Sequence, residues 1–196
     1  MMHMYVYSSG VYYIPCISKA ESEFIYSVRL LWEQHSLWTR SAIVSLVFDL
    51  PDTEFVLARL LKNAEDMGES LEPFYGVQIG EKYGSLIHEH LVLAADLVKA
   101  SKAGDIATAE KKEREWYQNA DDIALYLSSI NPFLTQKEVQ DMMYHHLALV
   151  KDEAVSLLQK DYQKNVELFD KIELQALFMA DIISKAIVKQ YPAFIS

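Results

Sequence analysis

The sequence predicts an all-α fold, a six-helix bundle made of three tandem αα-hairpins with a core like that of a four-helix bundle. Apolar residues recur at three- and four-residue steps through most of the chain, and no strand pattern competes. Glycine and proline are scarce and separate these apolar segments. We therefore expect one helical domain over residues 18–196, preceded by an N-terminal extension over residues 1–17.

The positions of glycine and proline divide the domain into segments of helical length. The predicted helices cover residues 19–48, 52–74, 77–102, 106–131, 136–160 and 162–190. The segments Ser18–Glu21 and Thr135–Glu138 both fit the capping box that begins a helix. Gly104 followed by Asp105 suits a left-handed residue after one helix and the N-cap of the next.

An internal repeat of about 55 residues groups these helices into hairpins over residues 19–74, 77–131 and 136–190. A histidine occupies the same place on the first helix of each hairpin: His35, His90 and His146. An amide residue follows on each second helix: Asn63, Asn119 and Gln175. In the first two copies the amide begins a shared pattern, Asn-Ala-acid-Asp-apolar, so these copies match each other more closely than the third.

Several short segments stand out: 31–40 (LWEQHSLWTR), 73–76 (PFYG), 89–91 (EHL), 116–121 (WYQNAD), 127–132 (LSSINP) and 151–154 (KDEA). Together they resemble a small family of uncharacterised Gram-positive bacterial proteins. The resemblance covers roughly residues 28–192 and implies no established activity. It implies that related proteins include exported or lipid-anchored members. Some members are labelled acetylglutamate kinase, but a nucleotide site of that kind needs a glycine-rich loop between a strand and a helix. Six scattered glycines and no predicted strands exclude it.

Composition limits the partners of the chain. Its 28 acidic and 18 basic residues give a net charge of −10, so nucleic acid and anionic membranes are not expected partners. Charges interrupt every apolar run, and residues 1–17 lack the features of a secretory signal, so we expect a cytoplasmic protein. The single cysteine, Cys16, excludes an intrachain disulfide and is interpreted as a passive residue. The sequence leaves open whether the chain forms a homo-oligomer.

The three histidines are the strongest candidates for chemistry. Each lies on an apolar helix seam, so the rings are expected to point inward and to be neutral. If the hairpins bring them to one level, they predict a site for Zn, Cu or Fe, with Glu173 or Glu153 as a further ligand. The chain has no Glu-x-x-His and no His-Glu-x-x-His, which disfavours a di-iron or zinc-protease site.

The structural alternative is that each histidine is a core residue hydrogen-bonded to the amide of its own hairpin. In a ligand site, the candidate contacts are Trp38, Arg40 and the three amides, and Trp116 is among the aromatics that could line a pocket. Arg40 is expected to pair with an inward acid such as Asp66.

Two functional hypotheses follow. The first is a bundle that binds a metal ion or small ligand through inward histidines, and the second is a non-catalytic interaction or structural module in which they are core residues. The first requires polar groups that converge in a cavity. The second requires an exposed apolar patch.

Overall fold

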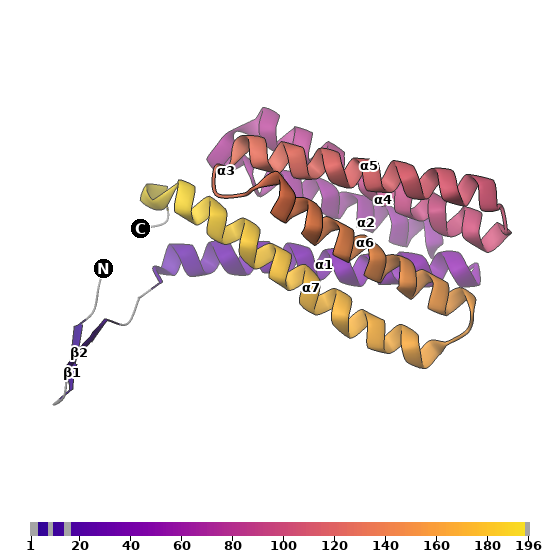
Figure 1. Ribbon diagram of the computed structural model, residues 1–196, viewed down its shortest axis with the longest axis horizontal. Coiled ribbons are helices and arrows are strands. Elements are labelled where there is room, and N and C mark those ends of the chain that lie inside the picture. The colour runs from indigo at the N-terminus through magenta and orange to yellow at the C-terminus, as the bar shows by residue number, and fades with distance from the viewer. Residues whose placement is uncertain (1–3, 8–9, 14–16, 195–196) are drawn as a thin grey trace.

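Six long helices follow one another in the described part of the chain, which confirms the all-α fold class (Figure 1). The computed structural model describes residues 4–7, 10–13 and 17–194. The helices are α1 (Lys19–Phe48), α2 (Thr53–Glu69), α4 (Val77–Ala103), α5 (Ile106–Ile130), α6 (Gln136–Leu158) and α7 (Tyr162–Gln190). The short α3 (Glu72–Tyr75) lies between α2 and α4, and a 3₁₀ turn, η1 (Pro192–Phe194), follows α7.

The six long helices form a closed ring. Each one packs beside the next along the chain, and α7 returns to pack against α1. Within the ring, α1 also contacts α4 and α6, so the first helices of the three hairpins approach one another at the centre. In Figure 1 the turn between α4 and α5, the turn between α6 and α7, and the end of α1 all lie at the right-hand end of the ring. Among the described helices, none combines the length and the apolar run that crossing a membrane requires.

Helix ends follow the sequence signals closely. The Thr135 hydroxyl accepts from the Glu138 amide, and the Glu138 carboxylate accepts from the Thr135 amide, which confirms this capping box. The Asp105 carboxylate caps α5, and Gly104 before it adopts a left-handed φ of 71°. These caps satisfy amides and carbonyls that a helix end would otherwise leave unpaired.

The second predicted helix is shorter than expected, because α2 ends at Glu69 and not near residue 74. Pro73 explains the difference: proline has no amide hydrogen, and its ring would clash with the carbonyl of residue 69 in a continuous helix. Instead, the chain turns at Ser70 and Leu71, and Pro73 lies in the first turn of α3, where the missing hydrogen costs nothing.

The expectation that the chain contains no strand is wrong for the N-terminal extension. β1 (Met4–Tyr7) and β2 (Gly10–Tyr13) pair antiparallel, with Tyr7 opposite Gly10. Tyrosine and valine favour strands, and the two-residue connection is of hairpin length. The error arose because four-residue strands are too short to give a clear alternation. Cys16 lies outside the described residues.

Glycines allow α2 and α4 to approach very closely. A Cβ on Gly68 would lie 2.6 Å from the Gly80 carbonyl oxygen and 3.1 Å from the Gly84 Cα. Both are backbone atoms that cannot rotate away. The two helices therefore pack backbone to backbone at this point.

We expect Gly68→Ala to lower the free energy of unfolding by about 1–3 kcal/mol, because the added methyl group must push the two helices apart. The sign is informative, since Gly→Ala inside an unconstrained helix stabilises by up to about 1 kcal/mol. Urea unfolding followed by circular dichroism measures the change. Ser85→Ala on the exposed face of α4 is the control, with an expected change within about 0.5 kcal/mol. A stabilised Gly68→Ala variant would contradict the close approach.

Candidate functional site

Each of the three predicted histidines pairs with the amide residue of its own hairpin. The Nδ1 atoms lie 3.2 Å from Asn63 Oδ1 for His35, 2.9 Å from Asn119 Oδ1 for His90 and 2.9 Å from Gln175 Oε1 for His146. All three histidines and all three amides are buried. The structural alternative considered for these residues therefore describes their contacts.

The second hydrogen bond of each amide fixes the tautomer of its histidine. The amide nitrogens donate to the backbone carbonyls of Leu31, Leu86 and Met142, each four residues before the paired histidine. A carbonyl can only accept, so the amide oxygen must face the ring and accept from it. Nδ1 therefore carries the proton in all three rings, and Nε2 carries a lone pair.

Trp116 uses the lone pair of one histidine. Its indole Nε1–H donates to His90 Nε2 over 3.0 Å, and an indole nitrogen can only donate. Both nitrogens of His90 are thus occupied by protein groups. His90 lies on α4 and Trp116 on α5, so this bond and the Asn119 bond together connect the two helices of the second hairpin.

The three histidines line one small cavity at the centre of the ring, together with apolar side chains such as Met67 and Met143. The rings of His35 and His146 lie 5.9 Å apart between centroids. The cavity measures about 10 Å³, which is the room that about one water molecule needs. The prediction that the histidines reach one level is consistent with this arrangement.

The geometry, however, does not support the predicted metal centre. Among the described residues, no three His, Cys, Asp or Glu side chains are placed to hold an ion such as Zn, Cu or Fe. His90 has no free nitrogen to offer. Glu173, the proposed fourth ligand, lies on α7 beside Glu33 of α1; burial raises the pKa of Glu33, and the neighbouring Glu173 raises it further. Glu153, the alternative ligand, is engaged elsewhere.

Burial keeps the three histidines neutral, as the sequence predicts. Loss of hydration lowers the pKa of His35 and of His90 to about 3, and the neighbouring His146 adds to this effect. Burial likewise lowers the pKa of His146 to about 4. In each case the hydrogen bond to the amide opposes the shift but does not cancel it.

Arg40 pairs with an inward acid, but that acid is Glu153 on α6 and not Asp66. Arg40 Nη1 lies 2.6 Å from Glu153 Oε1, and the guanidinium also stacks over the ring of Phe169 on α7. Glu153 is almost fully buried, and burial raises the pKa of its carboxyl to about 7 against the opposing charge of Arg40. Asp66 instead pairs with Arg59 and Lys62 on its own helix.

Trp38, predicted as a ligand contact, is a half-buried surface residue. The guanidinium of Arg59 lies over its ring at 5.5 Å, which places Trp38 at the outer seam between α1 and α2. It lines neither the histidine cavity nor the larger one described next. Trp32 lines the histidine cavity, whereas Trp116 lines the larger cavity and donates a hydrogen bond to His90.

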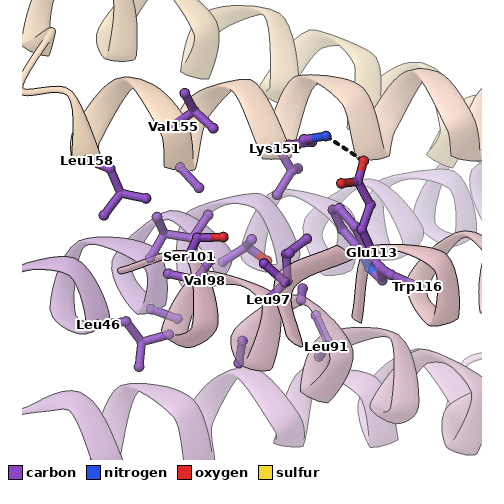
Figure 2. Close-up of a pocket in the computed structure, with 18 of the residues that line it drawn as sticks. Leu46, Leu91, Leu97, Val98, Ser101, Glu113, Trp116, Lys151, Val155 and Leu158 are labelled. Atoms are coloured by element: carbon purple, nitrogen blue, oxygen red, sulfur yellow. Dashed lines mark hydrogen bonds and ion pairs between the residues drawn. The ribbon is translucent and has the colours of Figure 1, made fainter. Parts of the chain in front are cut away.

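A second and much larger cavity of about 300 Å³ lies between α1, α4, α5 and α6. It lies between the histidine level and the end of the ring formed by the α4–α5 turn. Figure 2 shows its lining side chains converging, with Val155 and Leu158 of α6 opposite Leu97 and Val98 of α4. Toward this end, the α6–α7 hairpin diverges from the α4–α5 hairpin in Figure 1.

The wall of this cavity is mainly apolar, and many of its side chains are small. Leucine, isoleucine and valine form most of it, and five alanines stand where larger residues would close the gap: Ala42, Ala94, Ala95, Ala109 and Ala154. The charged groups of the wall come from Asp105, Glu110, Glu113 and Lys151. Glu113 and Lys151 form an ion pair of 2.5 Å across α5 and α6, drawn as a dashed line in Figure 2.

Thr39 gives the wall a buried hydroxyl without a partner. The side chain is 8% exposed, and in the described part of the chain its Oγ1 makes no hydrogen bond. Leaving such a group unpaired costs on the order of 1–3 kcal/mol. Natural cores seldom keep such a group. Less than 1 Å² of this oxygen is accessible, so the hydroxyl does not face the open space of the cavity.

Sequence reasoning missed Thr39, Glu113 and Lys151 and the cavity itself. A signal was present in the alanines, because Ala94 and Ala95 on α4 and Ala154 on α6 interrupt seams of larger apolar residues. Small residues at facing positions either draw helices together or leave a space between them. The sequence does not decide which, since the outcome depends on the angle between hairpins.

Comparisons with known proteins place no constraint on function, because no family model, curated protein or solved structure matches the chain.

The buried histidines predict a loss of stability in acid. Their folded pKa values lie below the ordinary 6.5, so the unfolded chain takes up protons first as the pH falls. Their contribution is therefore full above pH 6.5 and declines toward pH 4, by up to about 1.4 kcal/mol per pH unit for each ring. Glu153, whose pKa is raised, has the opposite effect between its unfolded value of 4.5 and about 7.

Comparing variants by urea unfolding at several pH values isolates the histidine term, because Glu153 is common to all of them. His146→Gln should reduce the slope of stability against pH between 6 and 4.5 by up to about 1.4 kcal/mol per pH unit. His88→Gln, an exposed change on α4, should leave the slope as it is. Equal slopes for the three proteins would show that His146 is not buried in the neutral form.

We expect Thr39→Val to stabilise the protein by about 1 kcal/mol, because it removes a buried hydroxyl that has no partner while keeping the shape of the side chain. The matched change Thr53→Val should destabilise, since the Thr53 hydroxyl donates to the Leu50 carbonyl over 2.6 Å. Thermal unfolding followed by calorimetry measures both. A destabilised Thr39→Val variant would mean that the Thr39 hydroxyl is satisfied in solution.

Proposed function

We propose that this chain binds a small, mainly apolar ligand in the cavity between α1, α4, α5 and α6. The observation that carries the proposal is the cavity itself, of about 300 Å³, with its mainly apolar wall. Ligand sites in proteins are typically of this kind, concave and apolar with a few polar groups that orient the ligand.

The form of the space supports a ligand over a packing defect. It opens to solvent, because Ser101, Asp105, Ile106 and Glu110 in its lining are exposed. The volume of about 300 Å³ is therefore that of a pocket that a ligand can enter and not that of an internal void. An apolar ligand that filled it would recover the dispersion contacts that the wall residues forgo.

The histidines then have a supporting role and do not bind the ligand directly. Trp116 contributes its ring to the cavity wall and its indole N–H to His90, whose other nitrogen is held by Asn119. This chain of bonds fixes the ring plane of Trp116. A rigid wall at this position favours binding, because less side-chain freedom is lost when the ligand enters.

We propose further that the three hairpins are copies of one ancestral αα unit. Support comes from the three equivalent histidine–amide–carbonyl arrangements, in which the amide always bonds the carbonyl four residues before the histidine. A match of this detail exceeds what helical periodicity alone requires. The ligand cavity is then a feature of the interface between copies, since its wall combines α1 with helices of the second and third hairpins.

Filling the cavity tests the proposed function. Ala154→Phe on α6 should occupy the space beside the wall and lower the affinity for decan-1-ol at least about tenfold, whereas Ala148→Phe on the exposed face of the same helix should leave it unchanged. Isothermal titration calorimetry gives the affinities, and quenching of tryptophan fluorescence reports on Trp116. The proposal fails if the unmodified protein shows no saturable binding, or if both variants bind as well as it does.

A further inference from the structure

The charges on the cavity wall are unbalanced. Three of its charged side chains are acidic and one is basic: Asp105, Glu110, Glu113 and Lys151. Asp105 and Glu110 are exposed, so these two lie where the cavity meets solvent, at the start of α5. A ligand that places its apolar part in the cavity would leave its head group near them.

The one basic side chain on the wall is already committed. Lys151 Nζ lies 2.5 Å from Glu113 Oε1, a pair that spans α5 and α6 (Figure 2). Lys102, in the last turn of α4, is also paired. Its Nζ lies 2.6 Å from Asp49 Oδ1 and donates to the Leu46 carbonyl over 2.9 Å. Neither ammonium group is available to a ligand without the loss of an existing partner.

The carboxylates of Glu110 and Asp105 differ from these lysines in their partners. Within residues 17–194, no Lys, Arg or His side chain forms an ion pair with Glu110. The Asp105 carboxylate accepts from the amide and the hydroxyl of Thr108, and these hydrogen bonds lower its pKa, so it is ionised at neutral pH. In the described part of the chain, neither carboxylate at the mouth of the cavity therefore forms an ion pair with a protein cation.

We infer that the ligand of this cavity is a single-chain amphiphile with a positively charged head, such as an alkylamine, whose head group lies beside Glu110 and Asp105. The inference rests on the proposed function and names the class of ligand. Coulomb attraction to two carboxylates favours an ammonium head, and the same carboxylates repel a fatty acid. The net charge of −10 acts in the same direction over longer range.

Three ten-carbon probes that differ in the head group alone test the inference: decylamine, decan-1-ol and decanoate. Titration calorimetry at pH 7 and low ionic strength should give the order decylamine, then decan-1-ol, then decanoate, with about fivefold or more between the first and the last. Raising the salt concentration to about 0.5 M should reduce this ratio, because exposed charges are screened within a few ångströms.

Charge variants locate the effect. Glu110→Gln should weaken decylamine binding and strengthen decanoate binding, while the affinity for decan-1-ol stays the same. Asp122→Asn, which removes one charge from an exposed position on α5 outside the cavity, is the control and should leave all three affinities unchanged. The alcohol also shows whether a variant has kept its folded cavity.

The outcomes separate the two proposals. If decan-1-ol binds but the three probes bind equally, or decanoate binds best, the inference is overturned and the proposed function stands. The second result would mean that Lys151 exchanges Glu113 for the ligand carboxylate. If no probe binds, the proposed function fails and the inference with it. A decylamine preference that persists in Glu110→Gln and at high salt also overturns the inference.

Discussion

A neutral imidazole inside a protein needs one acceptor and one donor, and the way this chain supplies the acceptor organises the rest of the structure. In every hairpin, an amide on the second helix accepts from the histidine and donates to the backbone of the first helix. The amide thereby fixes the rotation and the height of one helix against the other. Because a buried polar group without a partner is costly, a slip of either helix by one turn would leave several such groups unpaired.

The fold and the histidine contacts could be predicted because their signals are local or repeated. Helix periodicity, the capping box at Thr135 and the fixed spacing between each histidine and its amide need no knowledge of how hairpins pack. The partner of Arg40 could not be predicted, since Glu153 is 113 residues away and several acids are equally plausible from sequence. The metal site failed for a similar reason: one donor, Trp116, occupies the nitrogen that an ion would need.

The larger cavity could not be predicted because its wall combines side chains from all three hairpins, which lie far apart in the sequence. At the level of the histidines the core is closed by large side chains such as Met67 and Ile123, and the central cavity is very small. One or two turns further along, alanines take their place and the third hairpin diverges. Closure at one level holds the wall in position at the other, so a single core can be both well packed and open to a ligand.

In the closed ring every long helix has two neighbours, so the packing does not depend on which helix comes first along the chain. Phe74 packs against Phe24 near the start of α1 and against Tyr191 just after α7, at centroid distances of 4.8 and 5.7 Å. The start of α1 and the end of α7 therefore lie at one place. A ring of this kind has no unique first hairpin, so a circularly permuted chain that starts with α4 or α6 would keep every neighbouring pair of helices.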